Sequence, residues 1–72
     1  MIEEFINSSS SLIAKFRYDE DESTLYVVFR SNNKQYAYAE VTHEEFLDMR
    51  AAPSHGKWFN ENIRGIKPVT EV

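Results

Sequence analysis

Three stretches in the first half of the chain alternate between apolar and polar residues. Residues 12–18, 24–30 and 34–41 each have the period of two that places successive side chains on opposite sides of an extended chain. Their β-branched and aromatic side chains are typical of strands. We predict a three-stranded antiparallel meander. Its apolar face carries Leu12, Ala14, Phe16, Leu25, Val27, Phe29, Tyr36 and Tyr38, and its other face carries Ile13, Lys15, Arg17, Tyr26, Val28 and Arg30.

The polar segments between these stretches predict hairpins and a register. Residues 19–22 are consecutive acids, which repel one another and belong in a solvent-exposed loop. A four-residue loop there places Phe16 opposite Leu25. The second connection, Asn32-Asn33, suits a two-residue type I′ turn because asparagine tolerates positive φ. That turn places Phe29 opposite Tyr36.

Helix signals begin directly after the third stretch. Thr42 and Glu45 have the spacing of a capping box, in which each side chain bonds the backbone amide of the other. The predicted helix covers residues 43–51, because Pro53 disfavours helical geometry in the residue before it.

A second helix is predicted over residues 55–64. Ser54 is a suitable N-terminal cap, and Gly65 a suitable C-terminal stop. Phe59, Ile63 and Ile66 share one side of this helix, joined by Trp58. We expect both helices to pack on the apolar face of the sheet, which gives an α+β layer structure.

The length and composition of the chain bound its organisation. Seventy-two residues make one domain, which we expect to comprise a flexible lead-in over 1–10, a single domain over 11–66 and an extended tail over 67–72. The absence of cysteine excludes a disulfide scaffold and a thiolate zinc site. The apolar runs are too short to span a membrane. Acids near the N-terminus, where a signal peptide has bases, favour a cytoplasmic protein.

The charge of the chain is −4, which opposes non-specific binding to nucleic acid because each phosphate contact needs a cation. The charge is uneven, however. Residues 1–49 hold most of the acids, whereas residues 50–72 hold more bases than acids. A local basic patch therefore remains compatible with the acidic total.

Three motifs make the chain resemble the KTSC domain family. The first is Ser10-Ser11-Leu12-Ile13, followed by Tyr18-Asp19. The second is the central Tyr36-Ala37-Tyr38. The third is the long segment Ala51-Ala52-Pro53-Ser54-His55-Gly56-Lys57-Trp58-Phe59-Asn60-Glu61-Asn62-Ile63-Arg64. The resemblance covers about residues 8–66.

The resemblance implies a small module that occurs at the C-terminus of some lysyl-tRNA synthetases and as a separate protein in bacteria and their phages. Attachment to a synthetase suggests RNA binding by association. The chain departs from the family at Asn32-Asn33, where glycines are common, and at Lys67-Pro68-Val69, where a more basic ending is common. We interpret these residues of the family motifs as structural: Tyr36, Tyr38, Trp58, Phe59, Asn60 and Ile63.

The start of the second helix is the first candidate site. A hydroxyl, free amides, a glycine that permits close approach and a cation are parts of a phosphate-binding site. The residues concerned are Ser54, His55, Gly56, Lys57 and, further along, Arg64. In the alternative interpretation, Ser54 is only a cap and Gly56 only lets the two helices approach.

The outer face of the sheet is the second candidate. Lys15, Arg17, Tyr26 and Arg30 combine cations with an aromatic ring, as in platforms for single-stranded nucleic acid. The alternative is an ordinary outer face, on which lysine stems cover a tyrosine ring.

No catalytic, cofactor or metal motif accompanies these candidates. No nucleophile has an evident base, and His43 and His55 lack a third ligand partner. We therefore expect a non-catalytic binding module without metal or cofactor. RNA bound through the start of the second helix and nearby basic residues is the leading hypothesis, and a protein-interaction module or homodimer is the alternative.

Overall fold

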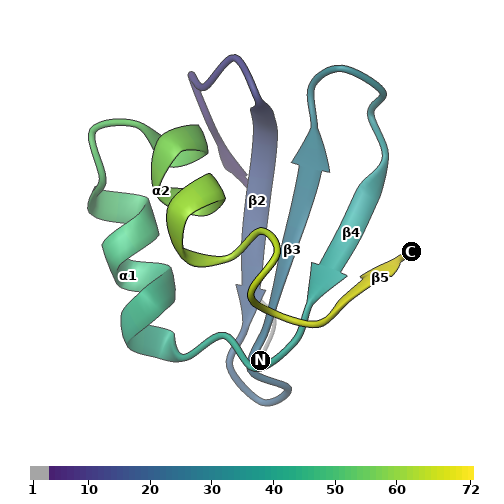
Figure 1. Ribbon diagram of the computed structural model, residues 1–72, viewed down its shortest axis with the longest axis vertical. Helices are drawn as coiled ribbons and strands as arrows, with labels where there is room; N and C mark the ends of the chain where they lie inside the picture. Colours follow the sequence, from purple (N-terminus) through teal and green to yellow (C-terminus); the bar gives the residue numbers. More distant parts are fainter. Residues whose placement is uncertain (1–3) are drawn as a thin grey trace.

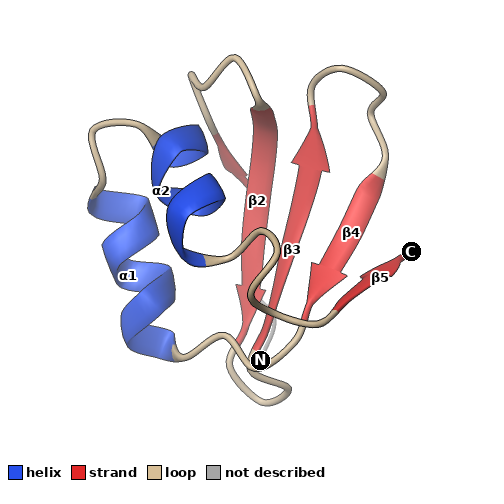
Figure 2. Ribbon diagram, viewed as in Figure 1, coloured by secondary structure: helices blue, strands red, loops and turns tan. Residues whose placement is uncertain are grey.

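Five antiparallel strands lie side by side in chain order, and two helices lie together on one side of the sheet (Figure 1, Figure 2). The computed structural model describes residues 4–72. The strands are β1 (Ile6–Asn7), β2 (Ile13–Asp19), β3 (Thr24–Phe29), β4 (Gln35–Tyr38) and β5 (Val69–Glu71), and the helices are α1 (His43–Ala51) and α2 (His55–Asn62). The α+β class is confirmed.

The prediction of a three-stranded sheet is wrong. β1 pairs with β2 at one edge, and β5 pairs with β4 at the other. Both edge strands are short and largely polar, so they lack the alternation that marks the central strands. Of the predicted lead-in over 1–10, residues 1–3 lie outside the described part of the chain.

The predicted pairing register is wrong by two residues in both hairpins. Phe16 lies opposite Val27 and not Leu25. Tyr36 likewise lies opposite Val27 and not Phe29. A register shift of two changes a residue's cross-strand partner and not its face, so the face pattern alone could not detect it.

The second hairpin loop spans residues 30–33 and is longer than the predicted two-residue turn. The Asn33 amide donates to the Phe29 carbonyl at 2.8 Å, and the Phe29 amide donates to the Lys34 carbonyl at 3.1 Å. Asn33, at a φ of 56°, is the asparagine of this loop that adopts the left-handed conformation. Type I′ geometry needs two such residues, so the loop closes differently.

A bulge in β2 breaks the predicted alternation. Ile13 pairs with Phe29, but Lys15 pairs with Val28, so Ala14 is an extra residue between them. Ile13, which we predicted on the outer face, is therefore turned into the core and is fully buried. Leu12 is only partly buried at the margin of the core.

The helix predictions are largely confirmed. α1 spans the predicted residues, and Thr42 and Glu45 form both bonds of the capping box. α2 ends two residues earlier than predicted, at Asn62, and the chain then turns through Gly65 at a φ of 78°. This turn carries Ile66 away from the core and leaves it 64% exposed, contrary to our prediction.

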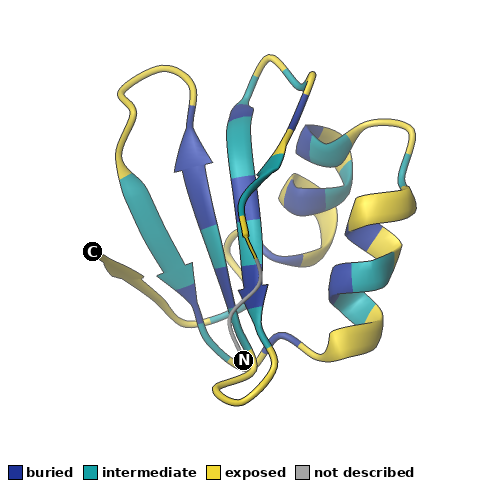
Figure 3. Ribbon diagram, turned by 180° about the vertical axis from the view of Figure 1, so that it is seen from behind, coloured by how far each residue is buried: buried dark blue, intermediate teal, exposed yellow. Residues whose placement is uncertain are grey.

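The core lies between the helices and one face of the sheet. Most of its largest fully buried side chains come from β2, β3 and both helices, and burial on the sheet decreases toward β5 (Figure 3). Phe59 of α2 makes edge-to-face contacts with Phe29 at 5.7 Å and Tyr38 at 5.0 Å between ring centres. Phe46 of α1 stacks on Tyr18 at 4.9 Å. These contacts join both helices to the sheet.

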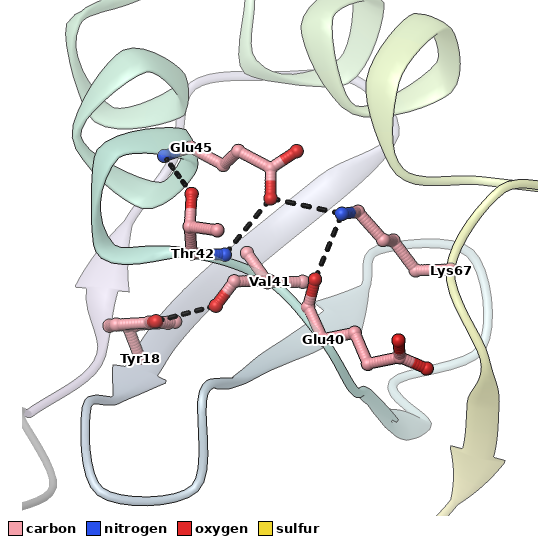
Figure 4. A network of polar contacts seen from close by, with 6 residues as sticks. All are labelled: Tyr18, Glu40, Val41, Thr42, Glu45 and Lys67. Atoms are coloured by element: carbon pink, nitrogen blue, oxygen red, sulfur yellow. Dashed lines mark hydrogen bonds and ion pairs between the residues drawn. The ribbon is translucent and has the colours of Figure 1, made fainter.

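A polar network ties the start of α1 to the chain that leads into β5 (Figure 4). The Lys67 ammonium donates to the Glu45 carboxylate at 3.0 Å and to the Glu40 carbonyl at 2.8 Å. Burial acts to raise the pKa of Glu45, but the bonds from Thr42 and Lys67 outweigh it and lower that pKa. The Tyr18 hydroxyl donates to the neighbouring Val41 carbonyl. The network holds the segment before β5 in place.

Candidate functional site

The start of α2 is engaged in packing. The Ser54 hydroxyl accepts from the Lys57 amide at 3.3 Å, as a helix cap does. The His55 Nε2 lies 3.3 Å from the Arg50 carbonyl, and its Nδ1 lies 2.7 Å from the Ser8 hydroxyl. A carbonyl can only accept, so Nε2 donates to Arg50, and in the neutral ring Nδ1 then accepts from Ser8. Both ring nitrogens of His55 are therefore used within the chain.

Gly56 permits close contact between α2 and the segment before β2. A Cβ placed on Gly56 would lie 2.5 Å from the Ser10 Oγ and 3.2 Å from the Leu12 Cβ. The glycine thus admits the N-terminal segment, where the alternative interpretation had assigned it to an approach between the two helices. Lys57 is exposed beside Trp58, which is partly buried against the core.

Gly56→Ala is expected to lower the free energy of unfolding by about 1 kcal/mol or more. Alanine gains about 1 kcal/mol over glycine in helix propensity, but the clash of its Cβ should cost more than that. The Ser10 hydroxyl cannot turn away freely, since it accepts from the Leu12 and Ile13 amides. Urea denaturation would measure the effect. The double variant Ser10→Ala/Gly56→Ala removes one clashing atom and should recover part of the loss. A Gly56→Ala variant as stable as the wild type would contradict this role.

The outer face of the sheet is occupied by its own side chains. The Phe5 ring centre lies 4.6 Å from the Lys15 ammonium and 4.9 Å from the Arg17 guanidinium carbon. That guanidinium also lies 4.5 Å from the centre of the Tyr26 ring. The Tyr26 ring is thus already covered on one side by a cation of the same chain.

Arg30, the fourth residue predicted for this face, holds the N-terminal segment. Its guanidinium donates to the carbonyls of Ser8 at 2.7 Å, Ser10 at 3.0 Å and Ile13 at 3.3 Å. These bonds use three of its five N–H donors within the fold. The structure therefore brings Lys15, Arg17 and Tyr26 together, whereas Arg30 binds the N-terminal segment.

A hollow between the β3–β4 hairpin, β5 and the end of α2 brings together residues that our sequence analysis had treated separately. We call it the aromatic cleft. Its volume is about 280 Å³, and it is lined by Leu12, Phe29, Ser31, Asn32, Tyr36, Tyr38, Arg64 and Val69.

The aromatic cleft has a floor of rings and a cation at its side. Phe29 and Tyr38 are 9% and 5% exposed and form the floor, whereas Tyr36 is more open. Tyr36 meets Phe29 edge-to-face at 5.3 Å. The Arg64 guanidinium carbon lies 5.9 Å from the Phe29 ring centre, which is within cation–π range. Tyr36 therefore offers the most accessible ring.

Arg64 carries a charge that the fold leaves available. Its Nη1 lies 3.4 Å from the Asn60 Oδ1. Within residues 4–72, no carboxylate oxygen lies within 4.0 Å of its guanidinium. Burial raises the pKa of Tyr38, although Arg64 acts to lower it, so the phenol stays neutral and can donate a hydrogen bond.

The structure separates Arg64 from the site to which we assigned it. Ser54, His55, Gly56 and Lys57 lie at the start of α2, whereas Arg64 follows its end. The family-motif residues Phe59 and Ile63 are fully buried, as a structural role requires, and Asn60 is exposed. Tyr36 and Tyr38, which we interpreted as structural, also line the cleft. Three lining residues were not predicted from the sequence, namely Ser31, Asn32 and Val69, because two lie in a loop of unexpected length and one in an unpredicted strand.

Two further findings concern residues 4–72. No group of three or more His, Asp or Glu side chains in this range is placed to hold a metal ion. None of the helices there has the length and apolarity needed to cross a membrane.

Comparisons with known proteins agree with the motifs. The family model described as KTSC domain matches residues 9–66. The crystal structure of a KTSC domain protein from Yersinia pestis superposes with a TM-score of 0.91 and 26% sequence identity, covering 100% of this chain and 99% of that chain. A search of curated proteins gave no match.

Proposed function

The chain belongs to the KTSC domain family, and on that premise we propose that it is a cytoplasmic, non-catalytic binding module that holds single-stranded RNA in the aromatic cleft. Single-stranded RNA is recognised by stacking its bases on aromatic rings and by binding its phosphates with cations. A site for single-stranded RNA should therefore combine aromatic rings and a cation in one accessible place.

The observation that carries the proposal is the position of Arg64. Its guanidinium lies over the Phe29 ring, lines the same cleft as Tyr36, and has no acidic partner within residues 4–72. Arginine suits a phosphate because its planar fork can donate two parallel hydrogen bonds. The outer face is a weaker candidate, because its cations lie closer to rings of the chain. Lys15 and Arg17 are 4.5–4.9 Å from the ring centres of Phe5 and Tyr26, whereas Arg64 is 5.9 Å from that of Phe29.

A non-catalytic role is supported by the state of the histidines. His55 uses both ring nitrogens within the fold. His43 stacks on Tyr18 at 5.9 Å and lies 3.6 Å from the Glu20 carboxylate. The Ser8 hydroxyl beside His55 is only 7% exposed, so a substrate has little access to it. Neither histidine lines the aromatic cleft.

Titration with a single-stranded RNA of about ten nucleotides, followed by fluorescence anisotropy, tests the proposal. Arg64→Gln should weaken binding about tenfold, which corresponds to about 1.4 kcal/mol. Lys57→Gln is the matched control, since it removes an exposed cation from the other end of α2. It should change the affinity by less than about twofold.

The opposite order, with Lys57→Gln harmful and Arg64→Gln neutral, would move the site to the start of α2. The absence of any RNA-dependent change in anisotropy or in the backbone amide signals would overturn the proposed function.

A protein-interaction role is a second candidate, favoured by the exposed edge at β5. Ile66, Val69 and Val72 are 64%, 52% and 62% exposed along this segment. The Val72 amide bonds the Gln35 carbonyl, and the Ala39 amide bonds the Pro68 carbonyl. The backbone groups of Glu71, between them, face away from β4, where another strand could pair.

Sedimentation at increasing protein concentration distinguishes the two candidates. A homodimer through β5 should raise the mean mass with concentration, and Glu71→Pro should abolish that rise by removing an outward amide. A constant monomer mass would exclude the homodimer.

A further inference from the structure

We infer that the aromatic cleft holds one unpaired nucleotide, with its base against Tyr36 and its phosphate on Arg64. The inference rests on the proposed function and specifies the ligand: a terminal or other unpaired nucleotide of a single-stranded RNA. Three properties of the cleft support it, namely its size, its number of cations and its polar groups.

The size of the cleft limits the ligand to one base. Small-molecule pockets usually have volumes of about 300–1,000 Å³, and this cleft, at about 280 Å³, lies at the small end. Two of its rings, Phe29 and Tyr38, are at most 9% exposed and serve as a floor. Tyr36 is the ring with an accessible surface, so there is room to stack one base and not a row of bases.

The charges around the cleft limit the ligand to one phosphate. Arg64 is the cation in its lining. The Lys34 ammonium is 3.6 Å from the Glu71 carboxylate, and the Lys67 ammonium is bound to Glu45. Glu71 also lies directly opposite Tyr36 in the β4–β5 register. A strand that continued along β5 would bring its next phosphate toward this carboxylate, which disfavours an extended contact.

The polar groups at the mouth of the cleft suit the edge of a base. The Asn32 Oδ1 accepts from the Lys34 amide at 3.0 Å, so the amide nitrogen of Asn32 remains a donor. Ser31 adds a hydroxyl to the lining. An unpaired base exposes acceptors on its edge, whereas a paired base has them occupied. A single-stranded nucleotide therefore meets groups that a helix could not use.

The first test is a titration of the ¹⁵N-labelled protein with uridine 5′-monophosphate, followed by the amide signals of residues 29–38 and 60–69. The nucleotide should shift these signals, and uridine should bind at least about fivefold more weakly because it lacks the phosphate that Arg64 contacts. Inorganic phosphate alone should bind more weakly than the nucleotide, because it cannot stack on Tyr36.

Matched variants test the ring. Tyr36→Leu should weaken nucleotide binding about tenfold, since stacking of one base contributes about 1–3 kcal/mol. Tyr36→Phe keeps the ring and should bind as the wild type does, which guards against a loss caused by unfolding. Tyr26→Leu, on the outer face, is the control and should leave the affinity unchanged.

The salt dependence of RNA binding reports the number of phosphate contacts. For a short single-stranded RNA, log K should fall with log salt concentration with a slope near −0.7, the value for one phosphate contact. A slope near −2 or steeper, or binding of the RNA without binding of the nucleotide, would overturn this inference and leave the proposed function standing. If neither the RNA nor the nucleotide binds, both this inference and the proposed function would be overturned. A shift caused by an acidic peptide but by neither RNA ligand would also overturn both.

Discussion

Replacing Phe59 by alanine is expected to lower the free energy of unfolding by about 3–5 kcal/mol. The side chain is fully buried and meets Phe29 and Tyr38 edge-to-face, so its removal leaves a cavity that the sheet cannot fill. The free energy of unfolding of a domain is about 0.05–0.15 kcal/mol per residue, or roughly 4–11 kcal/mol for a chain of this length. The variant should therefore be close to unfolding at room temperature.

Urea denaturation followed by the fluorescence of Trp58, the single tryptophan, measures this effect. Ile66→Ala is the matched control, because Ile66 lies in the same part of the chain but is 64% exposed. The free energy of unfolding of this control should stay within about 0.5 kcal/mol of that of the wild type. A Phe59→Ala variant that lost less than about 1 kcal/mol would show that α2 does not pack on the sheet as described.

Arg30→Met is expected to cost about 2 kcal/mol, because it removes three hydrogen bonds from a charged group while keeping much of the side-chain volume. The carbonyls of Ser8, Ser10 and Ile13 lose their shared donor. Since these carbonyls fix the segment between β1 and β2, the amides of residues 8–13 should also exchange with solvent faster.

Lys34→Met is the matched control for Arg30, since Lys34 lies on the same hairpin. Its ion pair with Glu71 has side chains 55% and 54% exposed, and such surface pairs contribute about 0–1 kcal/mol. Hydrogen exchange and urea denaturation of both variants would show whether the loss of stability is specific to Arg30→Met. Equal losses in the two variants would mean that Arg30 is an ordinary surface cation.

Local signals predicted the elements whose energetics are local. The capping box at Thr42 and Glu45 and the proline after α1 gave that helix its bounds, because the bonds concerned lie within one or two turns. Alternation identified the three central strands, whose apolar faces are buried whatever their partners.

Elements that depend on a distant partner escaped prediction. β1 and β5 are stabilised by pairing with β2 and β4, and their own residues give little pattern. The bulge at Ala14 and the two-residue register shift are likewise set by contacts between strands. For the same reason Tyr36, Tyr38 and Arg64 were each noted in the sequence, but their meeting in one cleft was not predicted.

Spacing along the chain was enough to predict the α+β class, the central strands, both helices and the resemblance to the KTSC family. Which cations remain free to bind a ligand depends instead on how the elements pack together. Arg30 and Arg17 are engaged by groups of the fold, whereas Arg64 faces the aromatic cleft. The physical reason is that the availability of a side chain depends on neighbours far away in sequence, and no local pattern records them.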